Sequence, residues 1–374
     1  MTRSVFSGAF RGFIDVLTRW FPMPKVLLPL TVGVDISGTS IKWIVLSEGV
    51  NEKRVLSFGQ ESISEGIVVN GIVQDVSALA QVLGEMKKKL GGIECAHAAL
   101  PEEAAYVFSM HVPENSSRKQ TLSMIEFELE DRVPIAPADA LYDFDVIMKH
   151  DDGVGEEIGV VVFPRDLAAS YAEAFALAKM RLFSLEVGAN SIARAVSNSS
   201  ANEPVTLLVD FGRLRTSFAV LKRGKPIFTS TVAIGGETID KAIMQKLSLS
   251  REDVTAFKNE QGFLAEGGKI SPGVEAISGT VAALADEVAR HYQYWDTRRN
   301  ERGERVTPVE RVFLVGGGAN LKGLTDYIAA RVQVECTRPN VWQNVCSFDD
   351  YIPPIDRRAS LQYATAIGLA LRGI

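Results

Sequence analysis

The sequence has 374 residues, more than a single hydrophobic core usually serves, so we expect two or more domains. Its 46% hydrophobic and 23% charged residues exclude a disordered chain, and its net charge of −6 disfavours a general nucleic-acid-binding protein. The three scattered cysteines disfavour a zinc site or a disulfide framework and favour a reducing compartment, and no apolar run reaches the roughly 20 residues that span a bilayer.

Residues 1–30 carry a stripe of large apolar side chains with helical spacing. The stripe consists of Phe6, Phe10, Phe13, Leu17 and Trp20. Interrupting charges and the lack of a small-residue cleavage site argue against a signal peptide. Two interpretations stay open. The segment is either an amphipathic helix on the inner membrane surface, or a helix that packs on the rest of the protein or on a partner.

The first half of the chain predicts a sheet followed by a separate small unit. Strands are expected at 31–35, 41–47 and 94–101, with a polar turn between the first two and a helix over 76–92. Residues 104–183 predict strand, helix, strand, strand and helix, and this block is compact enough to form its own subdomain.

The second half starts again with strands and continues with helices. Strands are expected at 204–212, 216–224 and 225–236, helices at 237–247, 250–260 and 276–298, a strand, glycine loop and helix over 309–332, and a closing helix at 360–373.

An internal repeat relates the two halves. When residues 31–49 are placed over 206–224 without a gap, Asp35 falls on Asp210, and several apolar residues and the final glycine also match. Each copy predicts a strand, an aspartate, a turn and a second strand. Two copies at a separation of 175 residues indicate two related lobes, each with one such hairpin.

Each hairpin carries the groups that bind a phosphate together with a metal. The backbone N–H groups of a tight turn form a concave anion site, and an aspartate can hold a hydrated Mg²⁺, which keeps most of its waters in proteins. Two facing hairpins would clamp a triphosphate, with Asp35 and Asp210 on either side of the metal. The alternative is that each aspartate only supports its own turn. The repeat and a third motif favour the ligand site.

The third motif is FLVGGGANLKGL at 313–324, in which a buried strand runs into Gly316, Gly317 and Gly318. Consecutive glycines let a flat ligand lie against bare backbone, although a sharp turn alone would also explain them. The motif does not match the GxGxxG of dinucleotide-binding domains, and the sequence contains no GxxxxGK[ST] P-loop.

In this order, the three motifs resemble the ATP site of the actin, Hsp70 and sugar-kinase superfamily. Within it, the chain is most similar to the PilM family of type IV pilus assembly proteins, which are relatives of the division protein FtsA. Supporting phrases are MIEFELEDRVPIAPADALYDFDVI, VAIGGETIDKAI and ERVFLVGGGANLKGLTDYIAARV. The resemblance implies an α/β, two-lobed, actin-like fold, a duplicated ribonuclease H-like architecture with four subdomains.

The resemblance also implies domain boundaries. Lobe I would cover 31–189, with the inserted subdomain at about 104–183, and lobe II would cover 190–357. A C-terminal helix at 358–374 would return to lobe I, and the amphipathic segment 1–30 would precede both lobes.

The implied cofactors are ATP and Mg²⁺, bound between the lobes. Asp35 and Asp210 would hold the metal through water. The residues expected at the nucleotide site are Asp35, Ser37, Gly38, Thr39, Ser40, Lys42, Asp210, Gly212, Thr216, Gly235, Gly236, Lys258, Gly316, Gly317, Gly318 and Ala319.

Members of this family act as cytoplasmic platforms that bind the N-terminal tail of the inner-membrane protein PilN. The resemblance therefore implies a cytoplasmic protein peripheral to the inner membrane, with a PilN-like protein as its partner and the tail in a groove beside the inserted subdomain. Pilus motor ATPases are further candidate partners, and no nucleic acid is expected. The alternatives are an FtsA-like filament-forming division protein and a small-molecule kinase of the same superfamily. The first would need a separate C-terminal membrane-targeting helix and the second a sugar-binding motif, and we find neither in the sequence.

The sequence departs from the family pattern at its candidate site. The departures are Ser37 before Gly38, the bulky turn Arg213-Leu214-Arg215, Glu186 and Gly188 where the family has Asp and Glu, and Thr255 in place of a Glu near Lys258. The arginines either add bidentate phosphate contacts or fill the phosphate space. Because no catalytic base can be named, we expect a nucleotide-binding scaffold with at most weak ATPase activity.

Overall fold

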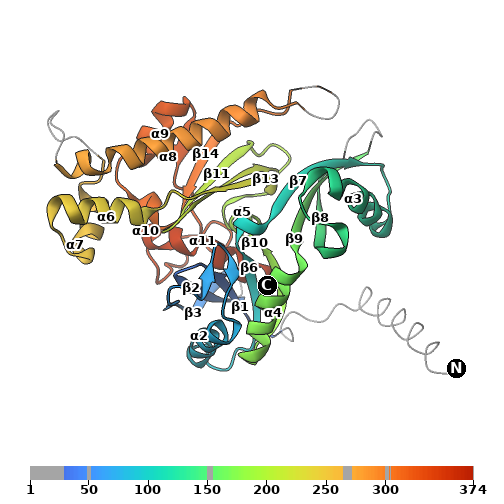
Figure 1. Cartoon of the computed structure of the whole chain (residues 1–374), viewed down its shortest axis with the longest axis horizontal. Coiled ribbons are helices and arrows are strands. Elements are labelled where there is room, and N and C mark those ends of the chain that lie inside the picture. The colour runs from blue at the N-terminus through green and yellow to red at the C-terminus, as the bar shows by residue number, and fades with distance from the viewer. Residues whose placement is uncertain are drawn as a thin grey trace.

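The computed structural model describes residues 29–48, 52–149, 155–263, 272–299, 303 and 305–373. The predicted amphipathic segment falls almost entirely outside these residues. Within them, no helix is both long enough and apolar enough to cross a membrane. The described strands form two five-stranded sheets, one three-stranded sheet and one short hairpin (Figure 1).

The first sheet has the strand order β10-β6-β1-β2-β3. Its strands are β1 (Thr31–Ile36), β2 (Ser40–Glu48), β3 (Lys53–Ser62), β6 (Cys95–Leu100) and β10 (Arg181–Val187). The first three are antiparallel, and β6 and β10 run parallel to β1. The helices around this sheet are α2 (Val76–Lys89), α4 (Arg165–Leu177), α5 (Gly188–Val196) and α11 (Ala364–Ala370). Although α11 lies near the end of the sequence, it packs against β1 and α5.

The second sheet repeats this plan, with the order β13-β12-β11-β14-β15. Its strands are β11 (Thr206–Phe211), β12 (Thr216–Lys222), β13 (Lys225–Val232), β14 (Arg311–Val315) and β15 (Glu335–Thr337). Its helices are α6 (Gly236–Leu247), α7 (Arg251–Glu260), α8 (Pro272–Thr297) and α9 (Leu324–Val332). The short helix α10 (Arg357–Ser360) leads into the Leu361–Tyr363 turn, which it contacts.

The registers of the two hairpins confirm the repeat. Asp35 lies opposite Lys42 in the first hairpin, and Asp210 lies opposite Ser217 in the second. On its other side, each aspartate-bearing strand pairs with a parallel strand, β6 or β14. The predicted duplicated α/β architecture is therefore confirmed.

The inserted unit is a three-stranded sheet of order β7-β9-β8, with one helix. Its elements are β7 (Tyr106–Val112), α3 (Arg118–Arg132), β8 (Ala140–Lys149) and β9 (Glu156–Pro164). It has its own hydrophobic cluster, which includes Ile125 and Leu129. Tyr171 and Phe175 of α4 instead belong to the main core.

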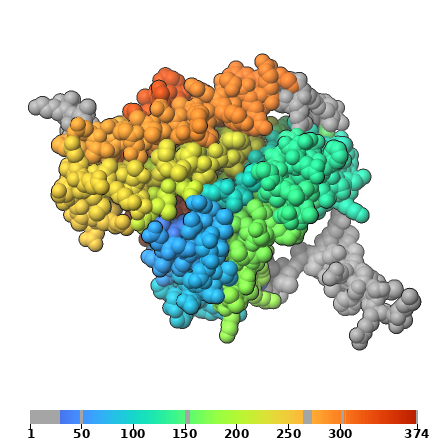
Figure 2. All heavy atoms as spheres, in the orientation of Figure 1, coloured from blue at the N-terminus to red at the C-terminus, as the bar shows by residue number. Residues whose placement is uncertain are grey.

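The inserted unit also contacts the second lobe. Strand β7 packs beside β13. In Figure 2, turquoise atoms of the inserted unit adjoin yellow-green atoms of the second lobe. Lys222 Nζ lies 2.6 Å from the carboxylate of Glu157, a residue that is only 5% exposed. The unit is therefore attached to both lobes.

Short elements complete the chain. They are the hairpin β4 (Val68–Val69) and β5 (Ile72–Val73), and the 3₁₀ turns Glu102–Ala104, Pro137–Asp139, Gly317–Asn320, Leu361–Tyr363 and Leu371–Gly373. Local sequence explains several boundaries. Ser117 and Gln120 form a capping box at the start of α3, and Asp75 caps α2. Asn70 and Gly71 both take positive φ in the β4–β5 turn, which suits a tight two-residue hairpin.

Candidate functional site

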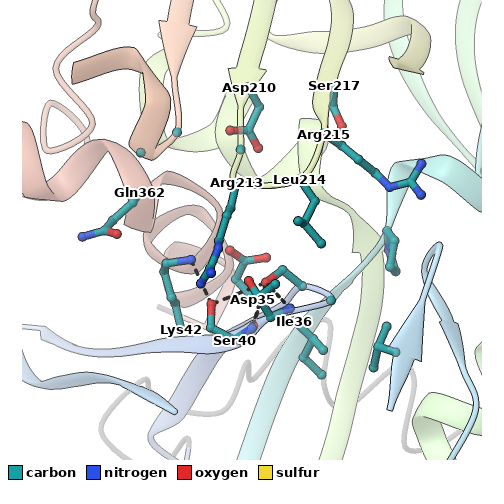
Figure 3. Close-up of a pocket in the computed structure, with 18 of the residues that line it drawn as sticks. Asp35, Ile36, Ser40, Lys42, Asp210, Arg213, Leu214, Arg215, Ser217 and Gln362 are labelled. Carbon is teal, nitrogen blue, oxygen red and sulfur yellow. Dashed lines mark hydrogen bonds between the residues drawn. The ribbon is translucent and has the colours of Figure 1, made fainter. Parts of the chain in front are cut away.

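A cavity of about 940 Å³ lies between the lobes, where β1 and β11 end. Asp35 and Asp210 point into it from opposite sides (Figure 3). Of the residues predicted for the nucleotide site, all except Thr216, Gly235 and Ala319 line this cavity. The structure therefore brings together residues that are separated by as much as 283 positions in the sequence, from Asp35 to Gly318.

The first hairpin turn is organised by Ser37. Its Oγ accepts hydrogen bonds from Ser40 N at 3.1 Å and Thr39 N at 3.4 Å, and donates to Ser40 O at 2.9 Å. Among the described residues, none accepts a hydrogen bond from the Gly38 N–H. The serine that replaces a glycine here thus supports the turn and leaves an amide for an anion.

The second hairpin turn is tied to the start of α6. Gly212 O accepts from Gly236 N at 3.0 Å, and Arg213 O accepts from Glu237 N at 2.8 Å. This close approach explains Gly235, because a Cβ there would lie 2.3 Å from Arg213 O. Thr216 is fully buried and donates from Oγ1 to Ile234 O at 2.6 Å. Gly235 and Thr216 therefore shape the turn without lining the cavity.

Close contacts explain why the loop after β14 consists of glycines. Gly316 has φ +84°, and a Cβ there would lie 2.4 Å from Asp210 Oδ1. A Cβ on Gly318 would lie 2.3 Å from the Phe211 ring. These glycines let the loop pass directly beside Asp210, so bare backbone borders the cavity. Ala319 is fully buried behind the loop.

The two aspartates crowd negative charge at the bottom of the cleft. Burial raises the pKa of Asp35, and the charge of Lys42 opposes this change. Burial and the charge of Asp35 together raise the pKa of Asp210 to about 7, again opposed by Lys42. A divalent cation would relieve this repulsion. Because no three acidic, His or Cys groups in the described part of the chain converge on one point, the residues fit a metal held through water rather than in a protein cage.

Sequence reasoning missed an acid at this site. Glu102, just after β6, lines the cavity, and a Cβ on Gly188 would lie only 2.8 Å from its Oε1. Its carboxyl thus occupies the space that a side chain at position 188 would need. Burial and the charge of Asp210 raise the pKa of Glu102 to about 8, against hydrogen bonds from Ser217 and the Ala189 backbone. The repeat holds a signal for it, because β6 corresponds to β14 and the segments after both strands must reach the cleft.

Lys258 and Glu186, at which the family pattern was compared, both form ion pairs, but only Lys258 lines the cavity. Lys258 lines the cavity and pairs with Asp240 at 2.6 Å, so an acid on α6 faces it rather than one at position 255. Glu186 is 5% exposed and binds Arg194 at 2.7 Å as well as Arg372. Its carboxylate therefore fastens α5 to the C-terminal segment and does not line the cavity.

A second groove of about 740 Å³ lies on the inserted unit, between β7 and α3. It is lined by Met110, His111, Lys119, Gln120, Ser123, Met124, Phe127 and Glu128. Phe127 is 84% exposed, the highest value among the large hydrophobic side chains of the described residues.

Comparisons with known proteins agree with the fold described above. A family model described as type IV pilus assembly protein PilM matches residues 33–374. The chain is similar to the solved "PilM-PilN type IV pilus biogenesis complex", with a TM-score of 0.75 and 22% identity over 92% of this chain and 98% of that chain. It is also similar to the ethanolamine utilization protein EutJ from Carboxydothermus hydrogenoformans, with a TM-score of 0.53 and 17% identity over 96% and 94% of the two chains. MreB5 of Spiroplasma citri bound to AMPPNP gives 0.52 and 10% over 92% and 95%. These similarities confirm the two-lobed actin-like fold.

Proposed function

Since the chain belongs to the PilM family of type IV pilus assembly proteins, we propose that it is a nucleotide-binding platform at the cytoplasmic face of the inner membrane. In this role it binds ATP with Mg²⁺ between its lobes and holds the N-terminal tail of a PilN-like inner-membrane protein. Hydrolysis is weak at most, because Gly188 stands where the family has a Glu, and the neighbouring Glu186 is engaged by two arginines and does not line the cleft.

One observation carries the nucleotide proposal. Both aspartate hairpins and the glycine loop meet on a single cavity, where the loop lies against Asp210 without any side chain between them. The volume of about 940 Å³ is within the usual range for cofactor sites. A solved structure with the same fold holds AMPPNP, which supports the same use of the cleft here.

We place the PilN-like tail in the groove between β7 and α3. Met110, Met124 and Phe127 offer apolar contacts to a peptide, and Lys119 and Glu128 supply charges of both signs. A chain with the same fold was solved as part of a PilM-PilN complex, which supports a PilN-like protein as the partner.

The nucleotide proposal is tested by calorimetric titration of the full chain with ATP and Mg²⁺. The wild type should bind in the micromolar range, and Asp210→Ala should bind at least about ten-fold more weakly, because it loses a charged metal-holding group. Asp139→Ala, on the inserted unit, is the control and should bind like the wild type. If the wild type binds no ATP, the nucleotide proposal is wrong.

The tail proposal is tested separately, with a synthetic N-terminal peptide of a PilN-like protein from the same genome. Phe127→Ser should abolish peptide binding and leave ATP binding unchanged. The control is Ile352→Ser, which changes another strongly exposed apolar residue, 80% exposed, outside the groove. Equal peptide affinity of the Phe127 variant and the wild type would place the tail elsewhere.

A further inference from the structure

The bulky turn between β11 and β12 places two arginines beside the phosphate end of the cleft. Arg213, Leu214 and Arg215 all line the cavity. Leu214 approaches the first hairpin, since a Cβ on Gly38 would lie 3.7 Å from its Cδ1. The turns of the two lobes therefore come close at this point, and the directions of the two arginines decide whether phosphates can enter.

Arg215 is turned across the cleft and held by lobe I. Its Nε lies 3.1 Å from Glu103 Oε1, and its guanidinium also donates to the Asn70 side chain. The chain segments that carry these partners are packed against lobe I. The Tyr171 hydroxyl donates to Gly71 O at 2.9 Å, and Pro101 packs so closely on Gly71 that a Cβ there would lie 2.7 Å away. Arg215 thus links the second phosphate turn to lobe I and takes its own bulk out of the phosphate space.

Arg213 has a longer and more exposed ion pair than Arg215, and its side chain points in another direction (Figure 3). Its guanidinium meets Glu237 Oε1 at 3.3 Å, and its side chain is 45% exposed. In Figure 3 it extends from the second hairpin toward Ser40 and Lys42 of the first. An ion pair this exposed contributes little free energy, so a ligand phosphate can compete for the guanidinium.

The balance of charges in the cleft favours an additional positive group, such as the Arg213 guanidinium, near the phosphates. Its lining holds seven Asp or Glu and five Lys or Arg side chains, so a triphosphate would enter a site without an excess of positive charge. Asp35 and Asp210 already share Lys42. A guanidinium can bind a phosphate through two parallel hydrogen bonds, which an ammonium group cannot do.

We propose that Arg213 binds the terminal phosphates of the nucleotide and makes the site prefer tri- and diphosphates over monophosphates, and that Arg215 is a positioning residue that fixes this turn across the cleft to Glu103. The proposal rests on the proposed nucleotide-binding function. It resolves the two roles that the sequence left open for these arginines, since one is available to phosphates and the other is withdrawn.

The test is a set of titrations with ATP, ADP and AMP in the presence of Mg²⁺. Arg213→Ala should lower the affinity for ATP about ten-fold or more and change that for AMP less than about two-fold. Arg213→Lys should fall between, because it keeps the charge and loses the bidentate geometry. Arg331→Ala is the control. It removes a surface guanidinium that pairs with Asp286, and it should leave all three affinities unchanged.

The positioning role has its own readout. Arg215→Glu and Glu103→Arg should each reduce the ATP-to-AMP preference, and the charge-reversed double variant should restore it, which a merely structural effect of either change would not do. If the wild type binds ATP and Arg213→Ala keeps its ATP-to-AMP preference within two-fold, the inference is overturned while the proposed function stands. If the wild type binds no nucleotide, both fail.

Discussion

Replacing Glu102 by Gln should stabilise the nucleotide-free protein, and the gain should grow with pH. In the unfolded chain this carboxyl ionises near its ordinary pKa of 4.5, whereas in the cleft its pKa is about 8. Between these two values the folded protein keeps a proton that the unfolded chain has lost. Rising pH therefore favours unfolding across this window, by up to about 1.4 kcal/mol per pH unit, and the cost is constant above pH 8.

The size of the effect follows from the same two pKa values. The difference between them corresponds to a loss of at most about 5 kcal/mol in the free energy of unfolding. Water in the open cleft and small movements of the lobes lower this value, so we expect about 2 kcal/mol at pH 8.5. For a chain of this length, that raises Tm by about 2–4 °C. The amide of Gln can still accept from Ser217 and from the Ala189 backbone, as the native carboxyl does.

The assay is thermal unfolding of both proteins at pH 5, 7 and 8.5, without nucleotide or Mg²⁺. The difference in Tm between Glu102→Gln and the wild type should be near zero at pH 5 and largest at pH 8.5. Glu65→Gln changes an exposed acid of the same cleft and should show no such trend. A difference that is constant with pH, or that favours the wild type at pH 8.5, would refute the reasoning.

Three further predictions concern packing and metal binding. Gly368→Ala should cost about 3 kcal/mol in urea unfolding, because its Cβ would lie 1.7 Å from Ser191 O, whereas Gly279→Ala, with open space around it, should gain about 0.5 kcal/mol. Tyr171→Phe loses the hydrogen bond to Gly71 O, so it should cost about 1 kcal/mol and speed amide exchange in the β4–β5 hairpin. Removing Mg²⁺ with EDTA should weaken ATP binding at least about ten-fold in calorimetry, since the cleft has more acids than bases; equal affinities would exclude the metal-holding role.

Local patterns predicted the parts of the site that are built locally. The order of buried strand, aspartate, turn and second strand in each copy predicted where Asp35 and Asp210 would lie, and the observed registers pair them equivalently. The run of glycines predicted a stretch of bare backbone against which a ligand can lie, and Gly316, Gly317 and Gly318 do line the cavity. Each of these features depends on residues within about ten positions of one another, which is the range over which sequence patterns are informative.

The parts that were missed depend on how distant segments meet. Glu102 becomes a cleft residue because Gly188, 86 positions later, leaves room for its carboxyl. The two arginines of one turn separate because lobe I offers Glu103 to only one of them. The family resemblance implied Gly235 at the nucleotide site, yet this glycine is needed against the Arg213 carbonyl. Such assignments require the packing of both lobes, which no local pattern contains.

Strand β12 of lobe II connects the cleft to the inserted unit. Arg215 is the last residue of the turn before β12, and β12 ends at Lys222. The ammonium group of Lys222 pairs with the nearly buried Glu157 on β9. This pair and the contact of β7 with β13 tie the unit to lobe II, while its chain connections to β6 and α4 tie it to lobe I, so a change in the angle between the lobes acts on the unit from both sides. If ATP binding draws the two phosphate turns together, the movement therefore reaches the sheet that borders the proposed tail groove. Linkage then requires that the tail change the affinity for ATP by the same factor by which ATP changes the affinity for the tail.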